Sequence, residues 1–548
     1  MTETASTEQA DQAPARRGLL AYLELERRDL YIAGALLAAA FVLRFFSPLM
    51  PDFLAHPQTG GLINNCVQST PVDAQGDLGT LCGLSYPFQR GYKTTTGQLA
   101  PPEGEIFDEI YFGVFAHDDL KGISYFDPEP PLSKEFIAAG EWLWGWYKAT
   151  FLGYHGSYAD LGFDTFGWRI AACVFGSFCP PMMFLLGRKL LPADPFFALA
   201  AGVLTCFDGM FFVQSRIGMI DIFPIFLILL TYFVFLVHWR SRGHRDSLLT
   251  LFLLGVCAGL AVSAKWISLA ALGTIGFFLL ARWVRAHVDL TVGTWEWGKG
   301  EGPSIPGGVS FGTYLPAAIV ALLVLPAAIY VASWFPFFLR GQFHGLGDLW
   351  KYQVDSYVYH ATLTAGHPYG SKWYSWPFLY RPVAYYFENQ SLGFDQVTHE
   401  PLVAWMVNLG NPWIWWSSLP SLVFVAWVTF KERSFAAALI TMGFVAQYLP
   451  WSRITRVVFL YHMFGGLIFM VLAVAFALNR LSKTGGIVVG LGEGSAFAIT
   501  GRHLAYAHLV IAVLLFGYFY PLWTALPMSG HALLSGFPAG KAWLPTWI

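Results

Sequence analysis

Two adjacent carboxylates, Asp108 and Glu109, stand in the stretch "FDEIYFGVFA", and a further acid, Asp127, follows in "YFDPEPPLSK". A carboxylate can take a proton from an incoming nucleophile, which is general-base chemistry. Two solvated loop acids are the plain alternative for an arbitrary Asp-Glu pair. The aromatic surroundings and the stiff double proline at positions 130 and 131 favour acids that are held in a defined place. Lys134, at the end of the second stretch, could meet an anionic lipid phosphate or merely extend toward water.

A second group of ionisable residues, Asp208, Arg216 and Asp221, occurs in "CFDGMFFVQSRIGMID" between two apolar runs. Charged groups at membrane depth are costly, so they tend to be paired or functional. An alternative is an ion pair of Arg216 with Asp221 or with Asp208 that only holds two helices together. Arg169 lies at the end of another apolar run and could equally anchor that helix at the membrane interface.

The elements that position these residues are expected to be membrane helices. The chain has 548 residues, of which 55% are hydrophobic and 12% are charged, and its mean hydropathy is +0.49. A soluble protein carries roughly twice that share of charge.

The net charge of −2 gives no reason to expect a nucleic-acid partner. The first 18 residues are polar, so we expect no cleaved signal peptide and a short cytoplasmic tail.

Apolar runs close to the length that crosses a bilayer predict an all-α integral membrane protein with about eleven transmembrane helices. The expected spans are residues 30–50, 166–187, 195–212, 219–238, 247–262, 266–281, 314–335, 412–430, 434–449, 461–478 and 504–520.

The distribution of Lys and Arg predicts the orientation of these spans, because cytoplasmic turns are enriched in cations. Arginines precede the first span, and every second turn is basic, as in "HWRSRGHR" and "NRLSK". We therefore expect a cytoplasmic tail at residues 1–29, a multispanning domain at residues 30–525, and an extracytoplasmic tail at residues 526–548. Two structured loops, residues 51–134 and 336–411, are then expected on the outer face.

The stretch "EFIAAGEWLWGWYKATF", directly after the first outer loop, is too charged and short for a confident span. It is typical of a helix lying flat in the membrane interface. Cys66 and Cys82 both fall in the first outer loop, where a disulfide is chemically allowed but not required. The scattered His360, His367 and His462 match no metal-ligand spacing, and we expect no metal site.

Several cations are expected at the outer membrane boundary, against the general preference for the cytoplasmic side. An anionic headgroup presented from the outer leaflet would explain them. Cations there would also stabilise a departing phosphate, because negative charge develops on it as its bond to a sugar breaks. The cations are Lys134, Arg169, Arg216, Lys265, Arg453 and Arg456.

The second outer loop contains the aromatic stretch "HPYGSKWYSWPFLYRPVAYYFE". Such a density of Trp and Tyr suits stacking on sugar faces, but it also suits a membrane interface, which is the commoner use of these residues.

The chain resembles the protein O-mannosyltransferase family, and bacterial members above all. The motifs "DEIYFGVFA", "YFDPEPPLSKEFIA", "VQSRIGMIDIF", "GLAVSAKWISLAAL", "HPYGSKWYSWPFL" and "RVVFLYHMF" occur in the order seen in that family. The resemblance covers nearly the whole chain. It implies the GT-C type of glycosyltransferase fold, with the active site at the outer face of the cell membrane.

The family resemblance also implies an activity and a set of site residues. The family transfers mannose from polyprenyl-phosphate-mannose to Ser or Thr hydroxyls of secreted proteins, with inversion and without a metal or another cofactor. It implies that Asp108 is the catalytic base and that Glu109 binds the acceptor. The donor and its lipid phosphate are expected at Asp127, Lys134, Arg169, Gln214, Ser215, Arg216, Asp221, Lys265, Arg456 and His462.

The sequence departs from the family pattern in two places. The family commonly reads Asp-x-His-Pro-Pro, whereas this chain has Glu129 in place of the histidine, which adds a negative charge beside the expected phosphate site. Eukaryotic members also carry a large sugar-binding-like domain in the later outer loop, and residues 336–411 are too few to hold it.

Two rival functions remain open at this point. A related transferase could use a lipid or glycan acceptor, which analysis of mannose on secreted proteins and of envelope lipids would distinguish. A transporter would show repeated halves and ionisable groups near mid-membrane, whereas this chain concentrates them at one face. A transferase acting on unfolded acceptors could also work beside the Sec translocon.

Overall fold

The computed structural model describes ten segments of the chain: residues 19–45, 108–163, 165–287, 290–292, 295–297, 304–388, 394–395, 397–490, 496–537 and 540–548. Cys66 and Cys82 lie outside them, so their pairing remains a prediction.

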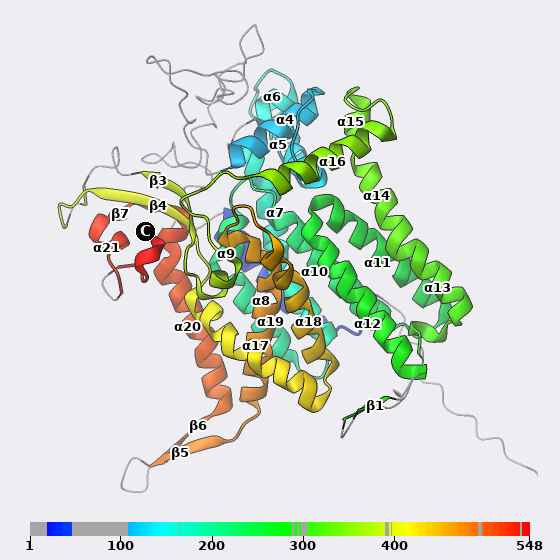
Figure 1. Ribbon diagram of the computed structural model, residues 1–548. Coiled ribbons are helices and arrows are strands. Elements are labelled where there is room, and N and C mark those ends of the chain that lie inside the picture. The colour runs from blue at the N-terminus through cyan, green and yellow to red at the C-terminus, as the bar shows by residue number, and fades with distance from the viewer. Residues whose placement is uncertain are drawn as a thin grey trace, which may run out of the picture.

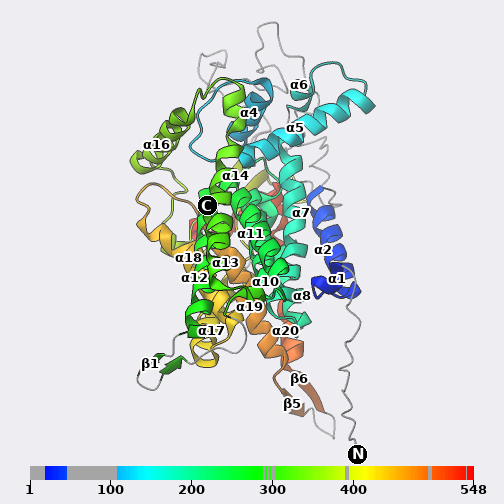
Figure 2. The same cartoon turned by 90° about the vertical axis from the view of Figure 1, so that its right-hand side faces the viewer.

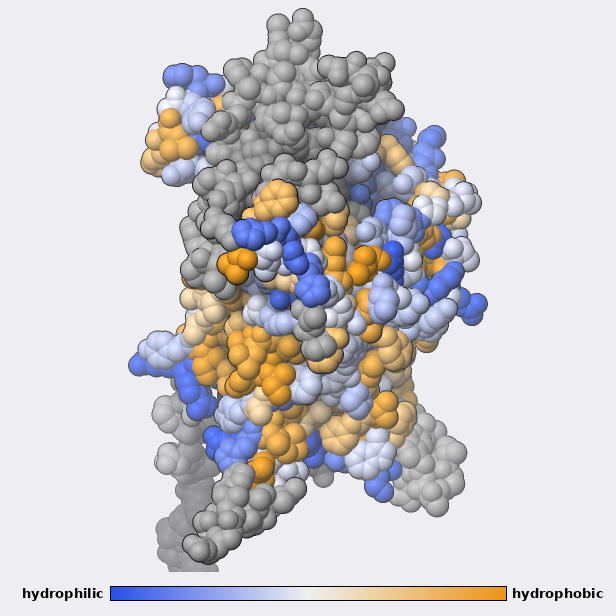
Figure 3. Space-filling model, turned by 90° about the vertical axis from the view of Figure 1, so that its left-hand side faces the viewer, coloured by the Kyte–Doolittle hydropathy of each residue, from blue (hydrophilic) through white to orange (hydrophobic). Residues whose placement is uncertain are grey.

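Long apolar helices form a bundle whose axes run along the molecule (Figure 1, Figure 2). Within the described residues, nine helical segments are long and apolar enough to cross a membrane, and each coincides with an expected span. Apolar side chains cover much of the middle of the face shown in Figure 3, as expected of a surface in contact with lipid. The helices of these nine segments are α7 (Thr165–Leu190), α10 (Ile222–Trp239), α11 (His244–Ala264), α12 (Leu269–His287), α13 (Phe311–Ile319) with α14 (Leu325–Ser333), α17 (Pro412–Glu432), α18 (Phe435–Tyr448), α19 (Phe464–Ser482) and α20 (Gly501–Thr524).

The other two expected spans are not among these nine segments. Helix α2 (Arg27–Phe45) carries charged residues at both ends, and residues 46–50 lie outside the described segments. The span expected at residues 195–212 is not continuous: α8 (Pro195–Cys206) has 12 residues, and α9 (Gly209–Gln214) follows after a break. The break arises because the Asp208 carboxylate caps α9, accepting hydrogen bonds from the backbone N–H groups of Met210 (2.9 Å) and Phe211 (3.1 Å).

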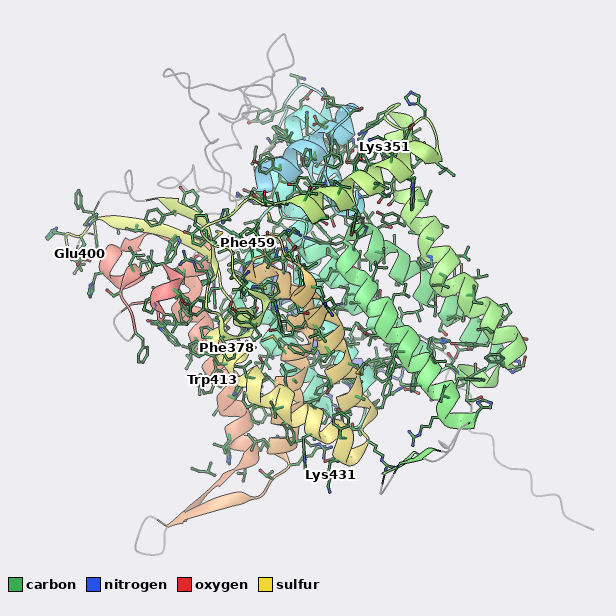
Figure 4. The ribbon with its side chains drawn as sticks, viewed as in Figure 1. Lys351, Phe378, Glu400, Trp413, Lys431 and Phe459 are labelled. Atoms are coloured by element: carbon green, nitrogen blue, oxygen red, sulfur yellow. The ribbon has the colours of Figure 1, made fainter. Side chains whose placement is uncertain are left out.

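The turns predicted to be basic and cytoplasmic share one end of the bundle, where ion pairs join them. Glu24 pairs with Lys189 (3.7 Å) and Arg240 (3.4 Å). Similar pairs join Asp29 to Arg188, Asp194 to Lys483 and Glu432 to Arg480. Figure 4 shows Lys431 at this end and Lys351 at the opposite end.

Further helices cover the opposite end of the bundle (Figure 1). They are α4 (Glu109–Lys121), α5 (Leu132–Phe151), α6 (Tyr158–Gly162), α15 (Phe335–Leu339) and α16 (Leu346–Thr362). Helix α5 is the expected amphipathic helix: it lies across the end of the bundle (Figure 2), burying Lys134 and Glu141 and exposing Trp142, Leu143 and Phe151. Its position in a membrane interface remains a prediction.

Small sheets accompany the helices, so the fold is mostly rather than entirely helical. Strands β3 (Val383–Glu388), β4 (Leu402–Asn408) and β7 (Met528–Ser529) form an antiparallel sheet. The hairpins β1–β2 (Leu290–Val292, Trp295–Trp297) and β5–β6 (Gly486–Gly490, Ala496–Thr500) lie at the basic end.

The described part of residues 526–548 is not a free tail, because it packs on the second outer loop. It supplies β7, and the Trp547 indole N–H donates to the carbonyl of Leu379 (2.7 Å). The Arg381 guanidinium donates to the carbonyls of Thr546 (2.7 Å) and Ile548 (2.6 Å).

The close approach of α5 and α6 can be tested at Gly145. A Cβ atom there would overlap the carbonyl oxygen of Tyr158, whereas one at Gly273 in α12 would meet nothing within 4 Å. We expect Gly145→Ala to lower the free energy of unfolding by about 1–3 kcal/mol through steric overlap, measured by thermal unfolding in detergent. Gly273→Ala is the control and should leave the midpoint unchanged or raise it. Equal midpoints for the two variants would contradict this packing.

Candidate active site

Asp108 stands at the start of α4, on the end of the bundle opposite the basic turns. It is half-buried, and its side chain makes no capping hydrogen bond to the helix. Burial raises the pKa of this carboxyl to about 6, with a further rise from Asp221 and an opposing effect of Lys265. Asp108 therefore lies near both of these charged groups, and it is ionised at neutral pH while being more basic than an ordinary aspartate.

Glu109, the next residue, forms a buried ion pair with Arg169 of α7. One carboxylate oxygen accepts hydrogen bonds from the Arg169 Nε–H (3.1 Å) and the backbone N–H of Gly218 (2.7 Å), and the other pairs with a terminal guanidinium nitrogen. Neither side chain is exposed. The pair therefore fixes α4 on α7 and on the segment before α10, which places Asp108. These internal contacts give Glu109 a positioning role, and acceptor binding by Glu109 remains a prediction.

Lys265 connects two acids from different parts of the chain. It lies between α11 and the short 3₁₀ turn at Trp266–Ser268, as expected for the outer turn between two spans. Its ammonium donates to Asp221 (2.8 Å) and lies 3.8 Å from the carboxylate of Glu129. Burial alone would lower the pKa of Lys265, but Asp221 and Glu129 outweigh it and raise the pKa. Lys265 is therefore a charged ammonium that interacts electrostatically with Asp108.

Lys134 makes its contacts within its own turn of the chain. Its ammonium pairs with Asp127 and donates to the carbonyls of Glu129 (2.9 Å) and Pro130 (3.0 Å). An ammonium group has three N–H donors, so these contacts use all of them, and Lys134 is 1% exposed. Lys134 and Asp127 thus hold the turn that carries Glu129, and donor binding by these two residues remains a prediction.

The Gln214-Ser215-Arg216 stretch ties α9 to distant elements. Gln214 donates to the hydroxyl of Tyr385 in β3 (2.8 Å), and the Ser215 hydroxyl accepts from the Arg44 guanidinium of α2 (2.6 Å). The Arg216 Nε–H donates to the carbonyl of Arg44 (3.4 Å). All three residues are buried. These contacts are structural, and donor binding by the three residues remains a prediction.

The two acids that were considered as partners of Arg216 have other contacts. Asp208 caps α9 and accepts hydrogen bonds from the backbone N–H of Asn411 (3.0 Å) and the indole N–H of Trp415 (2.9 Å). Asp221 pairs with Lys265.

Arg456 and His462 belong to the connection between α18 and α19. His462 is buried, its ring stacks on Trp376 (centroids 6.0 Å apart), and its Nδ1 accepts from the backbone N–H of Phe459 (3.1 Å). Figure 4 shows Phe459 on the same half of the molecule as Lys351, away from Lys431. Arg456 is half-buried, whereas Arg453 is exposed and was expected beside it.

Glu129 shows that these charges form one cluster. Burial works against ionisation of its carboxyl, but Lys265, His360, Lys134 and Arg456 together lower its pKa. The structure thus brings together Asp108, Asp221, Lys265, Glu129, Arg456 and His462 at one end of the bundle.

The sequence did not identify two residues of this region. Tyr385 accepts hydrogen bonds from Gln214 and Asn408 (2.8 Å each) and is electrostatically coupled to Asp108 and Asp221. His360, in α16, is coupled to Glu129. Both residues reach the site only through the tertiary packing of the second outer loop. In the sequence, the aromatic density of that loop is the only feature that indicates a functional role for it.

The described residues were expected to form no metal site. Within the described segments, no group of three or more His, Cys, Asp and Glu side chains could hold a metal ion. Independence of the activity from metal remains a prediction.

The buried pair can be tested by removing its cation. Arg169→Met leaves a buried carboxylate without its guanidinium partner, so we expect a loss of about 3–5 kcal/mol in the free energy of unfolding. Adding Glu109→Gln should recover part of that loss. The control is Arg480→Met, which breaks the half-exposed pair with Glu432 and should cost about 1 kcal/mol or less. Similar losses in the two single variants, measured by thermal unfolding, would contradict the structural importance of the buried pair.

Comparisons with known proteins agree with this arrangement. A family model described as dolichyl-phosphate-mannose-protein mannosyltransferase matches residues 97–339, and one described as the C-terminal four-helix membrane region of protein-O-mannosyltransferase matches residues 345–547. The chain is 26% identical to the polyprenol-phosphate-mannose–protein mannosyltransferase of Mycobacterium tuberculosis, over 82% of this chain and 88% of that protein. It is 24% identical to the protein of the same name from Corynebacterium glutamicum, over 76% and 81%.

A solved structure shows the same fold. The protein O-mannosyltransferase Pmt1–Pmt2 complex of Saccharomyces cerevisiae, bound to the sugar donor, matches with a TM-score of 0.68 and 13% identity, over 96% of this chain and 94% of the matched chain. This likeness establishes the GT-C fold. The two family models together span almost all of residues 97–547, and the chain therefore belongs to the protein O-mannosyltransferase family of glycosyltransferases.

Proposed function

We propose that this protein transfers mannose from polyprenyl-phosphate-mannose to Ser or Thr hydroxyls of secreted or membrane proteins. The observation that carries the proposal is that Asp108, a half-buried carboxylate at the start of α4, interacts electrostatically with Asp221 and Lys265, whose side chains lie 2.8 Å apart. The names of the bacterial relatives support this donor and acceptor. One base for the hydroxyl and cations for the phosphate are what such a transfer needs.

The transfer is a single displacement. The acceptor hydroxyl oxygen forms a bond to the anomeric carbon of mannose while its proton passes to Asp108. The bond between the anomeric carbon and the phosphate oxygen breaks, and its electron pair leaves with the lipid phosphate. Lys265 and Arg456 stabilise the charge that develops on that phosphate. One displacement inverts the anomeric centre.

The reaction takes place at the outer face of the cell membrane. The basic turns that share the opposite end of the bundle support a cytoplasmic assignment of that end, including the N-terminus. Asp108 then faces the exterior, where secreted chains emerge. An acceptor that arrives unfolded suits a position beside the Sec translocon.

The role of Asp108 is tested by Asp108→Asn in purified protein supplied with a Ser/Thr peptide and polyprenyl-phosphate-mannose. An amide cannot accept the proton, so we expect the transfer rate to fall by at least about 10²–10⁴-fold without a change in unfolding midpoint. Asp355→Asn, at an exposed acid of α16, is the control and should keep full activity. Retained activity in Asp108→Asn would refute the base, and mannose appearing only on lipid would refute the protein acceptor.

The same transfer activity should also persist in the presence of a metal chelator.

The pH profile provides a second test. The base must be deprotonated, so kcat should rise with pH through about 6, the pKa of Asp108, and then level off. Asp221 contributes to that raised pKa, so Asp221→Asn should move the inflection to lower pH. Single-turnover rates between pH 5 and pH 8 measure it. A profile that is flat through pH 6 in the unsubstituted protein would contradict the assignment.

A further inference from the structure

Helix α16 of the second outer loop is fixed to the active site by two sets of hydrogen bonds. The Tyr352 hydroxyl accepts from the backbone N–H of Asp127 (2.8 Å) and donates to its carbonyl (3.0 Å). The Trp266 indole N–H donates to the Tyr330 hydroxyl (3.0 Å), which donates to Gln353 of α16 (2.6 Å). The helix is thereby tied both to the turn that carries Glu129 and to the residue that follows Lys265.

His360 lies two helical turns beyond Tyr352, in the last turn of α16. Its ring meets that of Trp266 edge-on, with centroids 6.3 Å apart. The residue is half-buried, and its Nδ1 atom is buried with no hydrogen-bond partner among the residues that the structure describes. A buried polar atom without a partner costs about 1–3 kcal/mol, so such an atom beside a charged cluster points to a ligand.

The groups around His360 come from three other parts of the chain. Glu129 and Asp127 lie on the turn before α5, Lys265 follows α11, and Arg456 and His462 lie between α18 and α19. Tyr359 is its neighbour in α16. The pKa of His360 lies below its ordinary value, because burial, Arg456 and Lys265 lower it by more than Glu129 and Asp127 raise it. An added anion would favour the protonated ring, so anion binding and protonation are linked.

We propose that His360 binds the phosphate of the lipid donor through Nδ1–H, and that Glu129 is the positioning residue that favours the protonated imidazole once the phosphate is bound. The inference rests on the proposed function. In a sugar phosphodiester the phosphate carries one negative charge, and it gains a second when the bond to the anomeric carbon breaks. A hydrogen bond from His360 therefore strengthens as the reaction proceeds.

This assignment also accounts for Glu129. A carboxylate beside a phosphate site would repel the donor if it faced the phosphate alone. Glu129 instead lies 3.8 Å from Lys265 and interacts electrostatically with His360 and Arg456, so its charge is offset by Lys265 and Arg456 and favours protonation of His360. The second outer loop thus contributes a donor-binding group, and the site is built from both loops.

The test is binding of a polyprenyl phosphate, compared with the uncharged polyprenol of the same length, to the full chain in lipid nanodiscs. His360→Ala should weaken binding of the phosphate by about ten-fold or more, the worth of a charge-assisted hydrogen bond, and should not change binding of the polyprenol. His360→Asn, whose amide nitrogen can take the place of Nδ1, should recover part of the loss. His344→Ala is the control, because that ring is exposed on the same loop.

Glu129→Gln should move the pH at which phosphate affinity declines to a lower value, because the imidazole loses the acid that favours its proton. A pH profile unchanged from that of the unsubstituted protein would refute the role of Glu129. Equal loss of phosphate and polyprenol binding in His360→Ala would show a merely structural residue, and no loss would show that His360 does not bind the phosphate. Both outcomes overturn the inference. If the unsubstituted protein does not prefer the phosphate, the proposed function itself is wrong.

Discussion

The buried ion pair of Glu109 with Arg169 is the contact on which the active site depends. Neither side chain meets water, so each charge requires the other and the hydrogen bond from Gly218. These contacts join a loop helix, a membrane helix and the segment before another membrane helix. Because Asp108 directly precedes Glu109, this buried contact sets the position of the base.

The charges around Asp108 are balanced before any donor arrives. Lys265 is shared by Asp221 and Glu129, and the charge of Lys134 is met entirely by its own turn. A donor phosphate therefore enters a site whose cations already have carboxylate partners, and it must compete with them. Lys265 and Lys134 are thus held in place by their carboxylate partners, which offset part of the cost of burying these charges.

The sequence predicts the helices better than the contacts between the loops. Nine spans follow from apolar length, and Asp108, Asp221 and Lys265 could be proposed from their motifs. The break at Asp208 could not be predicted, because it depends on a side chain turning back to cap α9. The contacts of Lys134 could not be predicted, because its partners are two carbonyl groups and an acid of its own turn. His360 and Tyr385 reach the site only through the packing of the second outer loop, which leaves no periodic signal in the sequence.

In this account, Asp108 accepts the proton of the acceptor hydroxyl on one side of the anomeric carbon. Lys265 stabilises the phosphate that leaves from the other side. A structure of the protein with polyprenyl-phosphate-mannose bound tests this most directly. The account predicts a phosphate oxygen within ion-pair distance of Lys265 and an anomeric carbon whose face opposite the phosphate is turned toward Asp108. A sugar whose phosphate lies away from Lys265, or whose open face points away from Asp108, would contradict it.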